Sequence, residues 1–260
     1  MPRLHAIGVG VGDPAYLTVA AIEAIRDTDV FFVIDKGEVK SDLVGARETI
    51  LQTYAHAGKY RVVIIDDPAR ARIDVNSPLY PQEVKRWRDA RMDRIEAAIT
   101  EHLADGSTGA FLVWGDPSLY DGTLRIFDDL AERGMHLDYD VIPGISSIHA
   151  LTAKHRTLLN RIAGSVLITT GRRLARGWPT DADDVIVMLD TDFTARTFAG
   201  TDLGRELTIY WGAYLGRPDE LLLAGPLDEV VEQIIQTRDE ARARKGWIMD
   251  TYLLRRGALL

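Results

Sequence analysis

The chain has 260 residues, of which 46% are hydrophobic and 27% are charged, and its formal net charge is −8. This length is close to the size at which one hydrophobic core stops growing, so we expect two domains of about 130 residues each. The negative charge disfavours broad non-specific binding to DNA. The absence of cysteine excludes disulfides, a thiolate nucleophile and cysteine-bound metal centres. We find neither a run of about 18 apolar residues nor the pattern of a signal peptide, so we expect a cytoplasmic protein.

The first half of the chain alternates short apolar runs with helical patterns. The runs are continuous rather than alternating, which is typical of strands buried on both faces of a parallel sheet with helical crossovers. The spacing of apolar residues predicts helices between the runs. We expect strands over 4–10, 30–35, 61–66, 109–115 and 137–144, and helices near 17–25, 43–55, 78–104 and 120–133.

The second half has a different pattern, with shorter connections between its apolar runs. These runs predict strands over 165–171, 184–190, 206–216 and 220–226. We therefore expect an α/β protein of two α/β domains, the first with a mostly parallel sheet and the second with a mixed sheet. We place the domains at 1–117 and 118–260.

The N-terminal segment "GVGDPA" (10–15) matches the glycine pattern G-x-G-x-x-G/A of dinucleotide sites, and Asp35 ends the next predicted strand. A pyrophosphate needs the free N–H groups at the start of the following helix. Here Asp13 is predicted to be the N-cap and Pro14 the first helical residue, so the carboxylate occupies those donors and repels phosphate. The pattern therefore disfavours a nicotinamide-dependent oxidoreductase, which we keep as an alternative.

The triplet Gly12-Asp13-Pro14 recurs as Gly115-Asp116-Pro117, again between an apolar run and a helical pattern. Ligands of parallel sheets bind outside the carboxyl ends of the strands, so two such turns could form the wall of one cleft. That wall would present carboxylates and carbonyl groups, which suit a cation or a ribose hydroxyl. The alternative is that each Asp-Pro pair only starts a helix.

Three segments together carry a family resemblance: "GVGVGDPAYLT" (8–18), "WGDPSLYDG" (114–122) and "VIPGISSIHA" (141–150). In this order and spacing the chain resembles the tetrapyrrole methyltransferase superfamily. "VIVMLD", "TIYWGAYLGRPDE" and "LLLAGPLDEV" extend the likeness over essentially the whole chain. The long N-terminal half and the last two of these segments look like the subfamily of precorrin-6A synthases (deacetylating).

This resemblance implies an S-adenosylmethionine-dependent C-methyltransferase of cobalamin biosynthesis, usually a homodimer, with its cofactor in the cleft between two α/β domains. The subfamily converts precorrin-5 to precorrin-6A, with methylation at C-1 and release of acetate. Another precorrin C-methyltransferase and a non-catalytic tetrapyrrole-binding protein are the alternatives. The motifs imply that the cofactor is bound by Pro14, Trp114, Gly115, Asp116, Leu119, Ser146, Ser147, Met188 and Ala213.

Several of these residues also have a structural alternative. Asp116 is expected to contact the ribose or ammonium group of the cofactor, or to cap the helix after Pro117. Ser146 and Ser147 are expected to contact the cofactor or to cap the helix "SIHALTAKH". Many relatives have glycine at the position of Trp114, so the shape of the pocket differs there.

Further candidate residues come from the charged side chains. Arg172, Arg173 and Arg176 follow a predicted strand and could bind the carboxylates of a precorrin, with a solvated loop as the alternative. The basic segment 85–94 is expected to be an exposed helix face. The six histidines have no metal-binding spacing, so we predict no metal site. For the general base that activates water we suggest Asp35.

Overall fold

The computed structural model describes residues 2–35, 41–69, 74, 77–104 and 106–257. Its contacts divide the chain into two units, Met1–Ile145 and Ser146–Leu260. The sequence analysis places the boundary after Pro117. In the structure the division falls after Ile145 instead. The reason is that the strand formed by 138–142 pairs with the first strand of the chain and so belongs to the first sheet.

The first unit is built on a five-stranded sheet with the order β3-β2-β4-β1-β5. All neighbouring strands in it are parallel, which confirms the prediction from the continuous apolar runs. The strands are β1 (Arg3–Gly8), β2 (Val30–Asp35), β3 (Arg61–Asp66), β4 (Thr108–Val113) and β5 (Asp138–Ile142).

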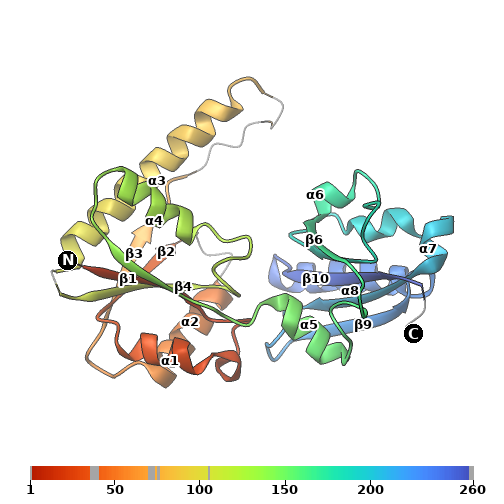
Figure 1. Ribbon diagram of the computed structural model, residues 1–260, viewed down its shortest axis with the longest axis horizontal. Coiled ribbons are helices and arrows are strands. Elements are labelled where there is room, and N and C mark those ends of the chain that lie inside the picture. Colours follow the sequence, from red (N-terminus) through yellow and green to blue (C-terminus); the bar gives the residue numbers. More distant parts are fainter. Residues whose placement is uncertain (1, 36–40, 70–73, 75–76, 105, 258–260) are drawn as a thin grey trace. The chain divides into compact units, whose positions relative to one another are not determined.

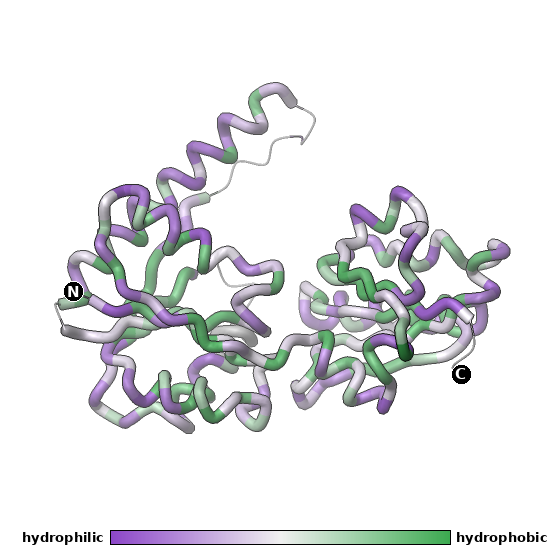
Figure 2. Tube along the Cα trace, in the orientation of Figure 1, coloured by the Kyte–Doolittle hydropathy of each residue, from purple (hydrophilic) through white to green (hydrophobic). Residues whose placement is uncertain are grey.

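Helices cover both faces of this sheet (Figure 1). α1 (Val19–Arg26) and α2 (Ser41–Tyr54) lie on one face, and α3 (Tyr80–His102) and α4 (Thr123–Glu132) lie on the other. The neighbouring residues Phe31 and Phe32 point to opposite faces, so each belongs to a different hydrophobic cluster. Figure 2 shows the resulting run of hydrophobic residues along the strands between more polar helices.

The second unit has a five-stranded mixed sheet with the order β6-β7-β10-β8-β9. Only β6 and β7 are parallel, and the other neighbours are antiparallel. The strands are β6 (Val166–Thr170), β7 (Asp184–Met188), β8 (Leu207–Ala213), β9 (Leu221–Pro226) and β10 (Asp250–Arg256). The helices are α5 (Ser147–His155), α6 (Gly171–Leu174), α7 (Asp202–Glu206) and α8 (Leu227–Lys245), with the 3-10 helix η3 (Thr194–Phe198).

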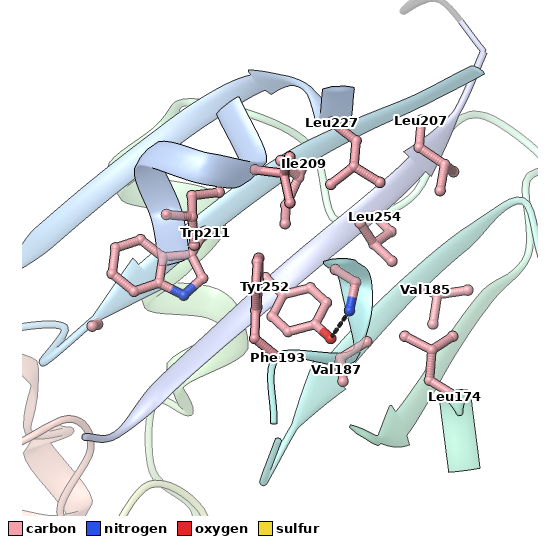
Figure 3. Packing of buried hydrophobic residues seen from close by; sticks show 14 of the residues in the cluster. Leu174, Val185, Val187, Phe193, Leu207, Ile209, Trp211, Leu227, Tyr252 and Leu254 are labelled. Carbon is pink, nitrogen blue, oxygen red and sulfur yellow. Dashed lines mark hydrogen bonds between the residues drawn. The ribbon is translucent and has the colours of Figure 1, made fainter. Parts of the chain in front are cut away.

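β10 was not predicted, although it is the central strand of this sheet. Its side chains Tyr252 and Leu254 pack in the main hydrophobic cluster of the unit (Figure 3). Arg255, also on β10, is fully buried, and its Nε donates to Asp184 Oδ1 at 2.9 Å. Another of its nitrogens donates to the carbonyl of Leu158 at 2.8 Å. A buried charge is tolerated only when it is paired and hydrogen-bonded, and these contacts meet that condition.

No helix in the described part of the chain is both long enough and apolar enough to pass through a bilayer.

His5 on β1 is a buried titratable group of the first unit whose environment opposes its charge. The residue is 5% exposed, and its Nδ1 lies 3.6 Å from Asp140 Oδ2 without a hydrogen bond. Burial lowers the pKa of His5 from its ordinary value of 6.5, because desolvation of the imidazolium outweighs the attraction of Asp140. The folded state therefore binds fewer protons than the unfolded state below that pH.

We expect the free energy of unfolding to fall as the pH is lowered through 6.5 toward the depressed pKa of His5, because the unfolded state gains the proton first. His5→Gln should reduce this fall. The exposed His136→Gln is the matched control and should retain it. Urea unfolding of both variants and the wild type between pH 7.5 and about 5 tests this. Parallel curves for the wild type and His5→Gln would contradict it.

Candidate functional site

The two Gly-Asp-Pro segments lie side by side at the carboxyl edge of the parallel sheet. β1 and β4 are parallel neighbours, so the segments that follow them leave the sheet at the same edge. The N–H of Gly115 donates to the carbonyl of Gly10 at 2.8 Å, and the N–H of Gly10 donates to the carbonyl of Gly115 at 3.2 Å. The structure therefore brings together the two turns that the sequence analysis singled out.

The loop after β5 packs directly against these two turns. A Cβ on Gly144 would lie 2.1 Å from the carbonyl oxygen of Gly115 and 2.8 Å from the Cα of Gly8. Only a glycine leaves room for this backbone-on-backbone contact. The three loops that end β1, β4 and β5 thus form one tightly packed junction.

Asp116 connects this junction through hydrogen bonds to the backbone. One carboxylate oxygen accepts from the N–H of Gly144 at 2.9 Å. The other accepts from the N–H of Ser118, also at 2.9 Å, and from the Ser118 hydroxyl. α4 begins at Thr123 with Gly122 as its N-cap, so the alternative that Asp116 caps this helix is wrong. Asp116 instead closes the turn after β4 and holds the loop after β5.

The first Gly-Asp-Pro segment starts a helix, as predicted, but a short one. Asp13 is the N-cap of the 3-10 helix η1 (Pro14–Tyr16), and its carboxylate accepts from the N–H of Ala15 at 2.9 Å. α1 starts separately after its own N-cap, Thr18. The carbonyl of Pro14 accepts from the hydroxyl of Tyr54 at 3.2 Å. The carboxylate of Asp13 therefore occupies the N–H of Ala15, which a bound phosphate would need as a hydrogen-bond donor.

The other predicted residues of the first unit lie along the same edge. Trp114 and Leu119 are half-buried, and the N–H of Leu119 donates to the carbonyl of Asp116 at 3.1 Å. Asp35 is the exposed last residue of β2, the strand beside β4. The edge therefore gathers carboxylates, carbonyl oxygens and an indole.

In the second unit the predicted residues are at strand ends and at the start of α5. Ser146 is 3% exposed and occupies the N-cap position of α5, but its side chain makes no capping hydrogen bond. Its Oγ lies 3.0 Å from Nδ1 of His149 instead. Ser147 is the half-buried first residue of α5. Met188, at the end of β7, is half-buried, whereas the side chain of Ala213 packs in the hydrophobic cluster.

Asp190, two residues after Met188, was missed by the sequence analysis. One oxygen of its buried carboxylate accepts from the hydroxyl of Tyr252 at 2.5 Å and from the N–H of Thr194 at 2.6 Å. Burial raises the pKa of Tyr252 well above its ordinary value, and the charge of Asp190 adds to this effect. The Tyr252 hydroxyl also accepts from the N–H of Ala195 at 3.2 Å, the dashed contact in Figure 3. The network fixes the turn after Met188.

Arg172 and Arg173 lie on α6, and Arg176 follows it by two residues, so all three come after a strand end, as predicted. All three side chains are exposed. Within the described ranges, no group of three histidine, aspartate or glutamate side chains could hold a metal ion.

The contact at Gly144 gives a direct test of the junction. We expect Gly144→Ala to lower the free energy of unfolding by about 1–3 kcal/mol or more, because the added methyl group overlaps the carbonyl of Gly115. Gly122→Ala is the matched control, since an added Cβ there meets no atom within 4 Å. Urea unfolding of the two variants measures both effects. Equal stability of the two variants would show that the loops separate without cost.

The comparisons with known proteins agree on one family. The tetrapyrrole (corrin/porphyrin) methylase profile matches residues 3–231. The precorrin-6A synthase (deacetylating) of Sinorhizobium sp is 42% identical over 259 residues, which is 99% of this chain and 97% of the relative.

Solved structures give the same result. The cobalamin synthesis related protein CobF of Corynebacterium diphtheriae superposes with a TM-score of 0.85 at 36% identity, covering 99% of this chain and 100% of that one. The uroporphyrin-III C-methyl transferase of Thermus thermophilus, complexed with S-adenosyl homocysteine, has a TM-score of 0.60 at 17% identity and 97% coverage of both chains, a likeness of fold. The chain therefore belongs to the tetrapyrrole (corrin/porphyrin) methylase family and is a methyltransferase.

Proposed function

We propose that this chain is the S-adenosylmethionine-dependent enzyme that converts precorrin-5 to precorrin-6A by methylating C-1 and releasing acetate. The observation that carries the proposal is the 42% identity, over 99% of this chain, to a relative named for that activity. The family membership supports the tetrapyrrole substrate. As the resemblance implies, we further propose a homodimer, which light scattering on the purified protein tests.

The carboxyl edge of the parallel sheet fits a sulfonium cofactor better than a nucleotide phosphate. Asp13 takes the N–H of Ala15, and Asp116 takes the N–H groups of Ser118 and Gly144. A phosphate would therefore meet carboxylates rather than free amides, whereas a cation or a ribose hydroxyl meets favourable acceptors. We propose that the cofactor contacts Pro14, Trp114, Gly115, Asp116, Leu119, Ser146, Ser147, Met188 and Ala213.

The reaction needs a water molecule, a proton acceptor and a methyl donor. Water attacks the acetyl carbonyl carbon, the bond between that carbon and the ring breaks, and acetate leaves with the oxygen of the water. The ring carbon retains the electron pair, stabilised by conjugation. When bound, S-adenosylmethionine would supply the electrophilic methyl group that this carbon takes up, with its S–CH3 bond breaking and S-adenosylhomocysteine as the leaving group. We propose that Asp35 accepts the proton of the water and that exposed arginines (Arg172, Arg173 and Arg176) bind substrate carboxylates.

The proposal is tested by incubating the purified protein with precorrin-5 and S-adenosylmethionine, measuring acetate and the mass of the product. We expect a gain of one methyl group, loss of the acetyl group and one acetate per turnover. Methylation without acetate would point to another precorrin C-methyltransferase. Binding of precorrin without turnover would point to a non-catalytic protein. In calorimetry, binding of a nicotinamide nucleotide without binding of S-adenosylhomocysteine would point to an oxidoreductase.

Asp116→Ala should weaken binding of S-adenosylhomocysteine and lower the free energy of unfolding, the latter by about 1–3 kcal/mol, because it leaves the N–H groups of Gly144 and Ser118 without their acceptor. Asp128→Ala, at an exposed position of α4, is the matched control. Calorimetric titration and urea unfolding give the two quantities. Lower stability with unchanged affinity would mean that Asp116 acts only on the fold.

A further inference from the structure

Arg47 is a cationic side chain at the same edge of the sheet that has no role in the function proposed above. It lies on α2, and its Nε donates to the carbonyl of Leu112, near the end of β4, at 3.3 Å. Its guanidinium carbon lies over the indole of Trp114, 5.8 Å from the ring centroid. The guanidinium is therefore fixed beside the loop that contains Gly115 and Asp116.

The indole that supports Arg47 is itself held by the first glycine turn. A Cβ on Gly12 would lie 2.4 Å from Cη2 and 2.8 Å from Cζ2 of Trp114, so the edge of the ring rests against the backbone of Gly12. Gly12 also has a φ of +101°, which a residue with a side chain rarely adopts. Gly12, Trp114 and Arg47 thus form one stack.

The electrostatic environment of this guanidinium is set by its burial and by the negative charge of Asp121. Arg47 is half-buried, and burial lowers the pKa of its guanidinium while the negative charge of Asp121 opposes the effect. Among the residues that the structure describes, no carboxylate is within ion-pair distance of Arg47, and its hydrogen bond to Leu112 uses Nε. A partly buried charge is stabilised by an anionic partner, and the two Nη groups form a fork that matches a carboxylate.

We propose that Arg47 binds a ligand carboxylate at the carboxyl edge of the parallel sheet, with Trp114 holding the plane of the guanidinium. Two ligands of the proposed function carry this group: the side chains of the tetrapyrrole and the methionyl end of the cofactor. The inference rests on that function. The environment of Arg47 differs from that of the other proposed carboxylate-binding arginines. Arg47 is half-buried, whereas the side chains of Arg172, Arg173 and Arg176 are exposed.

The experiment measures two dissociation constants for the full chain, one for uroporphyrin as a polycarboxylate tetrapyrrole and one for S-adenosylhomocysteine. Arg47→Ala should raise one of them at least tenfold. If only the affinity for uroporphyrin falls, the carboxylate belongs to the substrate. If only the affinity for S-adenosylhomocysteine falls, it belongs to the cofactor. Arg47→Lys, which keeps the charge without the fork, should show a smaller loss, and added methylguanidine should restore part of the affinity of Arg47→Ala.

The control is Arg26→Ala, at an exposed position at the end of α1, which should bind both ligands as the wild type does. Unchanged constants for Arg47→Ala would overturn the inference while leaving the proposed function intact. Equal losses of affinity for both ligands, with a lower melting temperature and no rescue by methylguanidine, would also overturn the inference. Such a result would show that the loop containing Gly115 and Asp116 has collapsed. A wild-type chain that binds neither ligand would overturn the proposed function, and this inference with it.

Discussion

The packing of backbone on backbone at the ends of β1, β4 and β5 is the constraint on which the first unit depends. Gly8, Gly115 and Gly144 approach so closely that a methyl group on Gly144 would overlap a carbonyl oxygen. Asp116 then fastens the loop after β5 with a hydrogen bond to the N–H of Gly144. Because three loops share this contact, the geometry of each depends on the other two.

The hydrogen bonds of two aspartates determine the chemical character of the edge. The carboxylates of Asp13 and Asp116 accept hydrogen bonds from backbone N–H groups. A ligand at this edge therefore meets fewer free N–H groups and more oxygen atoms. An edge of this kind favours cations over phosphates. Arg47 adds a single positive group over Trp114, so a ligand with a cationic centre and a carboxylate would find a partner for each. In the function that we propose, S-adenosylmethionine carries both groups, and a precorrin carries carboxylates.

Much of the fold could be predicted, because strands buried on both faces leave continuous apolar runs. The parallel sheet, the pairing of the two Gly-Asp-Pro turns and the cap at Asp13 all follow from local patterns and strand order. β10 could not be found in this way, because its apolar run covers only residues 252–254 and ends at Arg255, whose partner Asp184 is supplied only by the fold. The roles of Asp116, Asp190 and Arg47 likewise depend on contacts between residues far apart in the sequence.

The central place of β10 has a consequence for synthesis of the chain. β10 is the last strand in the described part of the chain, and it pairs with β7 on one side and β8 on the other. While the ribosome is still adding the residues before it, β7 and β8 have no strand between them, and Asp184 has no arginine at position 255 to neutralise it. The second unit therefore completes its sheet only after translation has passed residue 256, whereas the first unit has all its strands much earlier.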